Sequence, residues 1–325
     1  ALVFCLMIGT AALPHILMRY YTTPSVKEAR ESVAWSLFFI FLLYFTAPAL
    51  AVLAKYEVYT VLVNTPFDKL PEWIARWSTV DKSLLSVVDI NKDGILQLAE
   101  LSIGGDIIVL ATPEIGGLPY VVSGMVAAGG LAAALSTADG LLLTIANALS
   151  HDLYYKMLDP NASTARRVMV SKALLLVVAL CAAYVAAQKP ADILFLVSAA
   201  FSFAAATFFP ALTLGIFWKR ANKWGASLGM IAGLGITFYY MVTTQPWLYK
   251  LTHGGTALTP EVLKANTWWD IAPISAGLFG VPLGFAVIII VSMLTKAPGK
   301  DIQDLVEHVR FPSLDGKTSQ GSAAH

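Results

Sequence analysis

Residues 118–150 read LPYVVSGMVAAGGLAAALSTADGLLLTIANALS, and this stretch decides the class of fold. It is apolar over more than the roughly 20 residues that a helix needs to cross the hydrocarbon core of a bilayer. Polar side chains nevertheless gather at its centre, at Ser136, Thr137 and Asp139. Unpaired hydroxyls and carboxylates are costly in hydrocarbon, so polar groups inside a span mark an ion or substrate path by default. The stretch therefore predicts a transmembrane helix with a functional centre.

The oxygen atoms at this centre suit a hard cation. Ser136 and Thr137 are adjacent, so their hydroxyls point about 100° apart on a helix, and the carbonyl of Ala133 lies one turn earlier. Hydroxyl and carbonyl oxygens are hard donors, which hard cations prefer. These three residues therefore predict part of a sodium site. The alternative is that each hydroxyl bonds back to the carbonyl one turn earlier, or to a neighbouring helix.

Asp139 raises a separate question. It follows Ser136 by three residues, nearly on the same helical face. One interpretation makes it a relay for the departing cation or a proton-sensitive switch, because acids inside a membrane are often functional. The other makes it a carboxylate that reaches a cytoplasmic vestibule or pairs with a buried donor. The residues alone leave both open.

The composition extends the membrane interpretation to the whole chain. Hydrophobic residues make up 57% of it and charged residues 13%, and the mean hydropathy is +0.68. These values indicate an all-α polytopic membrane protein, since helices satisfy their own backbone groups in lipid. A net charge of +1 gives no basic excess for nucleic acid. No phosphate loop, no nucleophile with its base and no metal-hydrolase spacing is present, so we expect no enzyme.

The apolar runs divide the chain into three parts. We expect a membrane core over residues 1–295, an extracytoplasmic loop at 55–117 inside it, and a cytoplasmic tail at 296–325. The chain starts within an apolar run, which we interpret as the carboxy-terminal part of a longer protein whose amino-terminal half is a partner in the fold. The core should hold a partial helix near 1–13 and then six spans, at 33–54, 118–148, 168–187, 190–217, 224–245 and 272–295.

The charges in the loops predict the orientation. Lys and Arg gather in loops 14–32, 149–167 and 218–223 and in the tail, and each of these is separated from the next by two spans. All therefore fall on one side, which the positive-inside rule places in the cytoplasm. The acidic loop 55–117 then faces outward. We expect a protein of the cell inner membrane with a cytoplasmic carboxy terminus.

Two local features predict how the later spans pack. Pro210 lies within the expected span 190–217 and should kink it. Gly225, Gly229 and Gly233 recur every four residues on the next span, a spacing that allows another helix to approach closely.

The external loop contains a calcium-type motif. Residues 89–100, DINKDGILQLAE, fit the twelve-residue EF-hand loop position by position. The alternative is an acidic, hydrogen-bonded turn that holds no metal, and only one such loop occurs although EF-hands usually come in pairs. A bound calcium ion would stiffen the external loop and would not be the transport site. The predicted ligands are Asp89, Asn91, Asp93, the carbonyl of Ile95, Gln97 and a bidentate Glu100.

Four short blocks of the chain resemble one family. They are GTAALPHILMR at 9–19, AALST at 133–137, SHDLY at 150–154 and GIFWKRANKWGA at 215–226. Together they resemble the sodium:solute symporters, and in wording they are closest to the acetate- and monocarboxylate-permease branch.

The resemblance implies both a fold and a function. The fold would be part of two inverted five-helix repeats of the leucine-transporter type with extra flanking helices, and the substrate would be held near the midplane. Ala133 would give its carbonyl, and Ser136 and Thr137 their hydroxyls, to the family's sodium site. The function would be sodium-coupled symport of a small organic anion such as acetate. Alternatives are symport of another small solute such as an amino acid, a membrane sensor of solute or calcium, and a calcium-stabilised scaffold.

Overall fold

The structure is a computed structural model of the chain, and it describes residues 1–20 and 22–310. The chain divides into two compact units. The first unit comprises residues 1–30 and 140–325, and the second comprises residues 31–139. Each unit is described by itself below.

The described residues contain seven helical stretches that are long and apolar enough to cross a membrane. Each predicted span overlaps one of them, which confirms an all-α polytopic membrane protein. The stretches are Leu2–Tyr20, Val26–Leu62, Tyr120–Leu158, Thr164–Ala187, Ile193–Phe217, Lys223–Thr244 and Pro273–Leu294.

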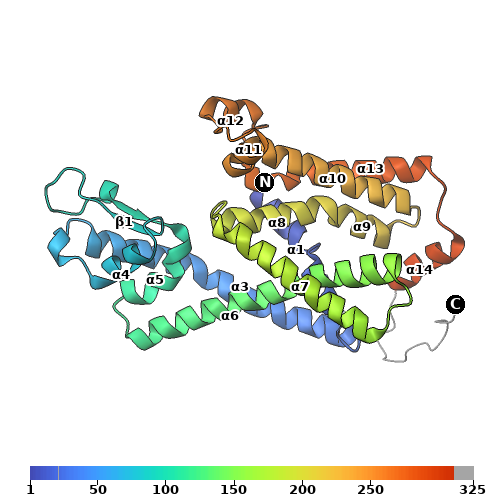
Figure 1. Cartoon of the computed structure of the whole chain (residues 1–325), viewed down its shortest axis with the longest axis horizontal. Coiled ribbons are helices and arrows are strands. Elements are labelled where there is room, and N and C mark those ends of the chain that lie inside the picture. The colour runs from blue at the N-terminus through green and yellow to red at the C-terminus, as the bar shows by residue number, and fades with distance from the viewer. Residues whose placement is uncertain (21, 311–325) are drawn as a thin grey trace. The chain divides into compact units, whose positions relative to one another are not determined.

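The first unit is built almost entirely of helices (Figure 1). After the last long helix, a short connection leads to one further amphipathic helix. The elements are α1 (Leu2–Thr10), α2 (Pro14–Tyr20), the π-helix η5 (Ala148–Leu158), α7 (Thr164–Ala187), α8 (Ile193–Thr207), α9 (Phe209–Phe217), α10 (Lys223–Thr244), α11 (Pro246–Thr252), α12 (Pro260–Asn266), the 3₁₀ turn η6 (Pro273–Ser275), α13 (Gly277–Leu294) and α14 (Lys300–Arg310).

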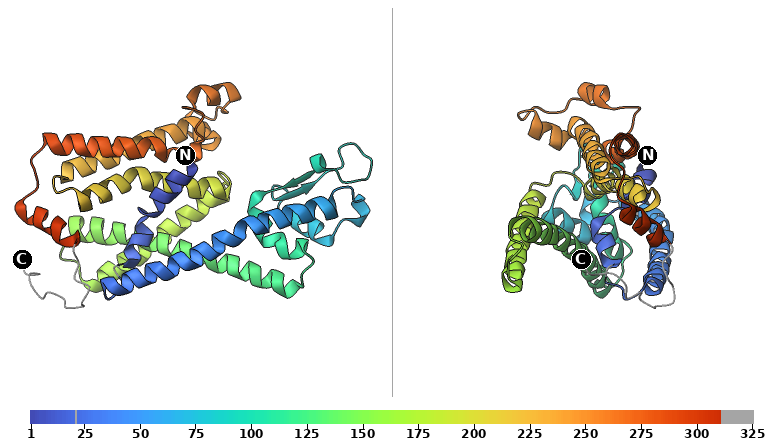
Figure 2. Two further views of the ribbon diagram at one scale, coloured as in Figure 1. Left: turned by 180° about the vertical axis from the view of Figure 1, so that it is seen from behind. Right: turned by 90° about the vertical axis from the view of Figure 1, so that its right-hand side faces the viewer.

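Helices α10 and α13 lie side by side, and Figure 2 shows the same pair from behind. The glycines of α10 make this possible. A Cβ atom at Gly225 would overlap the Ser292 hydroxyl, and one at Gly229 would overlap the side chain of Ile288. At Gly233 it would overlap the carbonyl oxygen of Ala206 on α8. The predicted close contact through these glycines is confirmed.

The predicted kink at Pro210 is also confirmed. The helix breaks at Phe208 into α8 and α9, and Pro210 occupies the first turn of α9. A proline has no N–H, so it cannot donate to the carbonyl of Ala206 one turn earlier. That carbonyl is the group that faces Gly233, so the kink and the close contact meet at one place.

The second unit carries a small folded region between two long helices. Helix α3 (Val26–Glu57) enters it and continues as the π-turn η1 (Val58–Leu62), and α6 (Tyr120–Asn147) leaves it. Between them, Leu62, Leu85, Leu96 and Ile107 form part of a shared apolar core. The remaining elements are η2 (Phe67–Lys69), α4 (Glu72–Val80), β1 (Leu85–Val87), η3 (Leu98–Glu100), β2 (Leu101–Ile103), η4 (Gly105–Ile107) and α5 (Ile108–Ile115).

Strands β1 and β2 form an antiparallel hairpin. Leu85 pairs with Ile103 and Val87 with Leu101. The calcium-type loop 89–100 therefore lies inside a hairpin and not between two helices. Three-residue strands carry too little pattern to be recognised from the sequence.

Two of the predicted spans end too early. The helical stretch that contains 33–54 continues to Leu62, and the one expected to end at 148 continues to Leu158. Polar residues at a span's end do not stop a helix, because water satisfies their side chains. The tail predicted at 296–325 contains α14, and residues 311–325 lie outside the described residues.

Candidate functional site

The predicted sodium ligands all lie on α6, in the second unit. Thr137 follows Ala133 by one turn, and its Oγ1 donates a hydrogen bond to the Ala133 carbonyl oxygen at 3.1 Å. This is the back-bonded arrangement given above as the alternative. The hydroxyl of Ser136 and the carboxylate of Asp139 make no hydrogen bond or ion pair with any described residue.

The polar centre of α6 is open on the surface of its unit. Ala133, Ser136, Thr137 and Asp139 are all exposed there. Hard cations take about six or more oxygen ligands in proteins. The carbonyl of Ala133 and the hydroxyls of Ser136 and Thr137 give only three, so a cation site on this face requires further ligands.

The end of α6 and the start of η5 border a cavity within the first unit. Its volume is about 1090 Å³. Thr144 points its hydroxyl at the Gly140 carbonyl, 2.8 Å away, and lies 3.2 Å from the Met18 sulfur. This cavity could not be predicted from the sequence, because the residues that line it come from separate segments. The lining includes Pro14, Met18, Thr144, Asn147, His151 and Asp152.

Asp152 is the acidic group at this cavity. Its Oδ1 lies 3.1 Å from Nδ1 of His151 and 3.6 Å from Nζ of Lys156. All three side chains are exposed, so these pairs contribute little to stability. They give the cavity charges of both signs.

Hydrogen bonds from backbone N–H groups to side-chain oxygens order the loop 89–100. Asp89 Oδ2 accepts a hydrogen bond from the N–H of Gly94, and Asn91 Oδ1 accepts one from Asp93. Asp93 Oδ1 accepts one from Ile95. Gly94 has φ +74°, a conformation that glycine adopts without strain. These bonds hold the side chains of the loop toward its centre.

Three of the predicted ligands come together there. Carboxylate oxygens of Asp89, Asp93 and Glu100 all lie within 4.8 Å of one another. Asp89 Oδ1 is buried and has no hydrogen-bond partner in the described part of the chain. Gln97 instead directs its amide N–H₂ at Asp93 Oδ2, 2.9 Å away. The loop therefore presents three carboxylates and one unsatisfied oxygen.

Glu100 is the most constrained of the three carboxylates. It is buried, and it accepts hydrogen bonds from the N–H groups of Gln97 at 3.0 Å, Ile90 at 2.8 Å and Asn91 at 3.3 Å. These bonds to the charged form, with that of Gln97 the strongest, hold the pKa of the Glu100 carboxyl below its usual value. The group therefore stays ionised at neutral pH.

The single loop also finds a pairing partner within its own unit. Leu96 donates to the carbonyl of Thr65 at 2.9 Å, and its own carbonyl accepts from Asn64 at 2.8 Å. The chain after η1 thus pairs with the loop.

The chain was compared with known proteins. A sequence profile described as the sodium:solute symporter family matches residues 109–233, which run from α5 into α10. An uncharacterized symporter of Cupriavidus necator is 56% identical over 309 residues, or 95% of this chain. The chain is therefore similar to the sodium:solute symporter family. The matched region contains the polar centre of α6 and the block at 215–226.

Two more distant symporters match most of the chain. A monocarboxylic acid transporter of Corynebacterium glutamicum is 27% identical over 328 residues, covering 100% of this chain, and the uncharacterized symporter YwcA of Bacillus subtilis is 27% identical over 286 residues, covering 86%. The chain spans about half the length of these relatives, from 44% to 51%. No solved structure matches it.

This similarity has two direct consequences. The family consists of transporters, and its name gives sodium as the coupling ion. The seven apolar helical stretches, together with this similarity, indicate a multi-pass membrane protein.

Proposed function

We propose that the intact protein carries out sodium-coupled symport of a small monocarboxylate such as acetate. The observation that carries the proposal is the polar centre of α6, where Ser136 and Thr137 stand beside the carbonyl of Ala133 in an otherwise apolar span. The likeness to a monocarboxylic acid transporter over the full chain supports the choice of substrate class.

The hydrogen bond from Thr137 to Ala133 is compatible with sodium binding. A hydroxyl has one donor and two acceptor lone pairs, and a carbonyl oxygen has two lone pairs. Thr137 therefore keeps its lone pairs for a cation while it donates to Ala133. Ser136 has no competing bond within the described residues. The missing ligands would come from another element of the inverted-repeat fold.

Sodium binding would then bias the conformation. A cation that bridges α6 and a second helix stabilises the state in which the two are close, by its difference in affinity between states. Rocking of one helix bundle against the other would expose the site inward. Asp139 lies about 4.5 Å further along the axis from Ser136, so its carboxylate would attract the cation as it leaves.

We expect labelled acetate to enter proteoliposomes that contain the intact protein only when sodium is higher outside. Acetate uptake that ignores the sodium gradient would reject sodium as the coupling ion and direct attention to Asp139 and protons. Uptake of an amino acid in place of acetate would reject the substrate class alone. A sensor or a scaffold would transport neither solute.

The proposed function also includes an orientation of the chain in the membrane. We infer an inner-membrane protein with α14 in the cytoplasm and the hairpin region 62–119 outside. The support is the alternation of basic loops, which the positive-inside rule explains.

We also propose that loop 89–100 binds calcium in a structural role. The observation that carries this proposal is Asp89 Oδ1, a buried oxygen without a partner among the described residues, which belongs to a carboxylate grouped with Asp93 and Glu100. Extracellular sites of this kind bind calcium with a dissociation constant of about 10⁻⁴–10⁻³ M.

Calcium at millimolar concentration should slow amide hydrogen exchange in 89–100, and Asp89→Asn should abolish the effect. Asp68→Asn, an exposed acid in the same external region, is the matched control and should keep it. Equal exchange with calcium and with chelator in the unaltered protein would contradict the proposal. Sodium-driven uptake that continues in chelator would agree with a structural role.

A further inference from the structure

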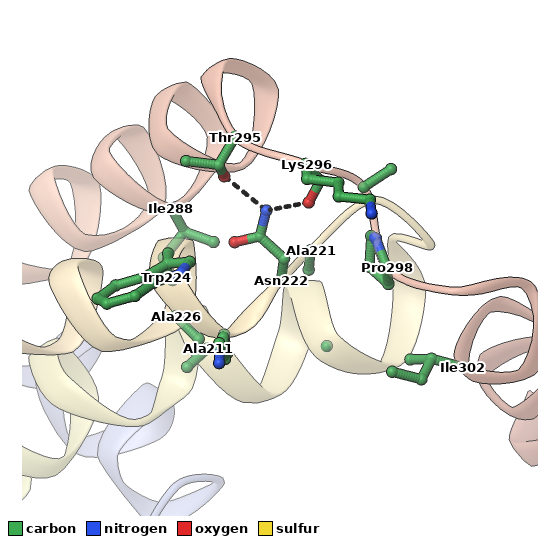
Figure 3. Close-up of a pocket in the computed structure, with 13 residues that line it drawn as sticks. Ala211, Ala221, Asn222, Trp224, Ala226, Ile288, Thr295, Lys296, Pro298 and Ile302 are labelled. Atoms are coloured by element: carbon green, nitrogen blue, oxygen red, sulfur yellow. Dashed lines mark hydrogen bonds between the residues drawn. The ribbon is translucent and has the colours of Figure 1, made fainter.

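A groove of about 670 Å³ lies where α9 ends, α10 begins and α13 gives way to α14. All of these elements belong to the first unit. The floor of the groove is apolar, and two lysines, Lys223 and Lys296, contribute to its lining. Figure 3 shows the residues that surround it. The apolar lining includes Ala211, Gly215, Ala226, Ile288 and Pro298.

The groove is held open by one amide side chain. Asn222 donates through Nδ2 to Thr295 Oγ1 at 2.7 Å and to the Lys296 carbonyl at 3.1 Å (Figure 3). Its Oδ1 accepts from the N–H of Gly225 at 2.8 Å and so caps the start of α10. The end of α13 is thereby joined to the start of α10 at one wall of the groove.

The lysines that line the groove lack acidic partners. Neither Lys223 nor Lys296 forms an ion pair with a described residue, and Lys223 Nζ lies 5.7 Å from the ring centre of Trp224. Two other basic residues nearby are already engaged. Lys219 pairs with Glu307 at 2.7 Å, and Arg220 donates to the Met293 carbonyl at 3.0 Å.

Helix α14 places this groove at the membrane surface. It begins six residues after α13 ends, and it presents an exposed apolar stripe made of Ile302, Leu305 and Val309. The stripe repeats at the spacing of one helical face, and its other side chains are mostly charged or polar. A short amphipathic helix of this kind beside the end of a span lies in the interface between lipid and water.

Helix α14 is joined to the end of α9 by the side chain of Arg310. Arg310 Nε donates to the carbonyl of Ile216 at 3.1 Å, and its Nη2 donates to that of Phe217. These are carbonyls of the last turn of α9, which have no partner within the helix. The acidic residues of α14, Asp301, Asp304 and Glu307, do not line the groove. The two free lysines thus set the charge of its lining.

We propose that this groove binds an anionic phospholipid, with an acyl chain along the apolar floor and the phosphate between Lys223 and Lys296. Basic pockets between transmembrane helices bind anionic head groups, and an exposed aromatic ring such as Trp224 is typical of this depth. A zwitterionic lipid would make the apolar contacts without a net charge for the lysines. A soluble anion would leave the apolar floor empty.

The lysines are tested with the purified intact protein in detergent. Dioleoyl phosphatidylglycerol should raise its Tm more than dioleoyl phosphatidylcholine does. Lys223→Gln with Lys296→Gln should reduce the shift with phosphatidylglycerol to the shift with phosphatidylcholine. The control is Lys250→Gln with Lys264→Gln, which removes the same charge from exposed positions on α11 and α12 and should keep the difference.

The apolar floor is tested with Gly215→Leu. A Cβ at Gly215 meets no atom within 4 Å, so leucine there should fill the groove without disturbing the helices. Native mass spectrometry should show loss of bound phosphatidylglycerol. Gly235→Leu on α10 also adds a side chain into open space, away from the groove, and should retain the lipid.

Three results would overturn the proposal. They are equal Tm shifts with the two lipids, a shift of the same size with inorganic phosphate or a short-chain phosphatidylglycerol, and retention of lipid by Gly215→Leu. None of these readouts involves transport, so the lipid site and the proposed symport stand or fall separately.

Discussion

Gly233→Leu is expected to prevent α8, α10 and α13 from packing together, and it should be the most damaging single substitution in the first unit. The Cβ of any side chain at 233 would overlap the carbonyl oxygen of Ala206 and approach that of Gly280 to 3.2 Å. Both obstacles are backbone atoms, so a side chain cannot rotate away to make room. Overpacking a core costs about 1–3 kcal/mol and sometimes more, and here three helices would have to separate.

The measurement is the yield of monodisperse protein after detergent extraction, together with its Tm. Gly235→Leu is the matched control, since it makes the same change on the same helix, two residues away, in open space. Gly233→Ala should fall between the two. If Gly233→Leu were as stable as Gly235→Leu, the close packing of α10 described here would be wrong.

The double variant Ser136→Ala with Thr137→Ala should lose sodium-driven uptake and still fold. Hydrogen bonds to charged groups contribute about 1.5–3 kcal/mol each, so removing two oxygen ligands should weaken apparent sodium affinity by a factor of about 100 or more. Folding should survive, because both side chains are exposed in their unit and the single hydrogen bond lost is that from Thr137 to Ala133.

Two controls isolate the ligand role. Thr137→Ser keeps the hydroxyl and should keep sodium dependence. Thr46→Ala on α3 removes a hydroxyl that also bonds back along its helix, at 2.9 Å to Leu43, and should leave uptake unchanged. Sodium dependence that persists in the double variant would remove α6 from the sodium site. Asp139→Asn would then be the next variant to measure.

The spans could be predicted from the sequence because lipid allows few alternatives. The close packing at Gly225, Gly229 and Gly233 and the kink at Pro210 could also be predicted. The first follows from the spacing of the glycines along one helix, and the second from the proline itself. The hairpin around 89–100 could not be predicted in this way. The turn DINKDG at 89–94 could be flanked by either helices or strands, so its sequence does not distinguish them. The pairing of Leu96 with Thr65 also joins residues that are far apart in the chain.

The candidate sites also differ in whether one element or several separate segments form them. The chemistry of Ser136 and Thr137 is readable from one helix, whereas the large cavity beside η5 is lined by segments 14–18 and 144–156 and by Phe208. The lipid groove likewise depends on Asn222, whose amide joins α10 to residues more than 70 positions later. Spacing along one element reveals nothing about such partners.

The pairing of Leu96 with Asn64 and Thr65 joins loop 89–100 to the end of a very long helix. Leu62 and Leu96 also share the same apolar core, so the π-turn and the loop cannot loosen independently. Any ion that tightens residues 89–100 must therefore stiffen the terminal turn of that helix as well. By thermodynamic reciprocity, a movement that bends this turn must weaken the ion's hold. Residues 89–100 and the end of the long helix are therefore mechanically linked.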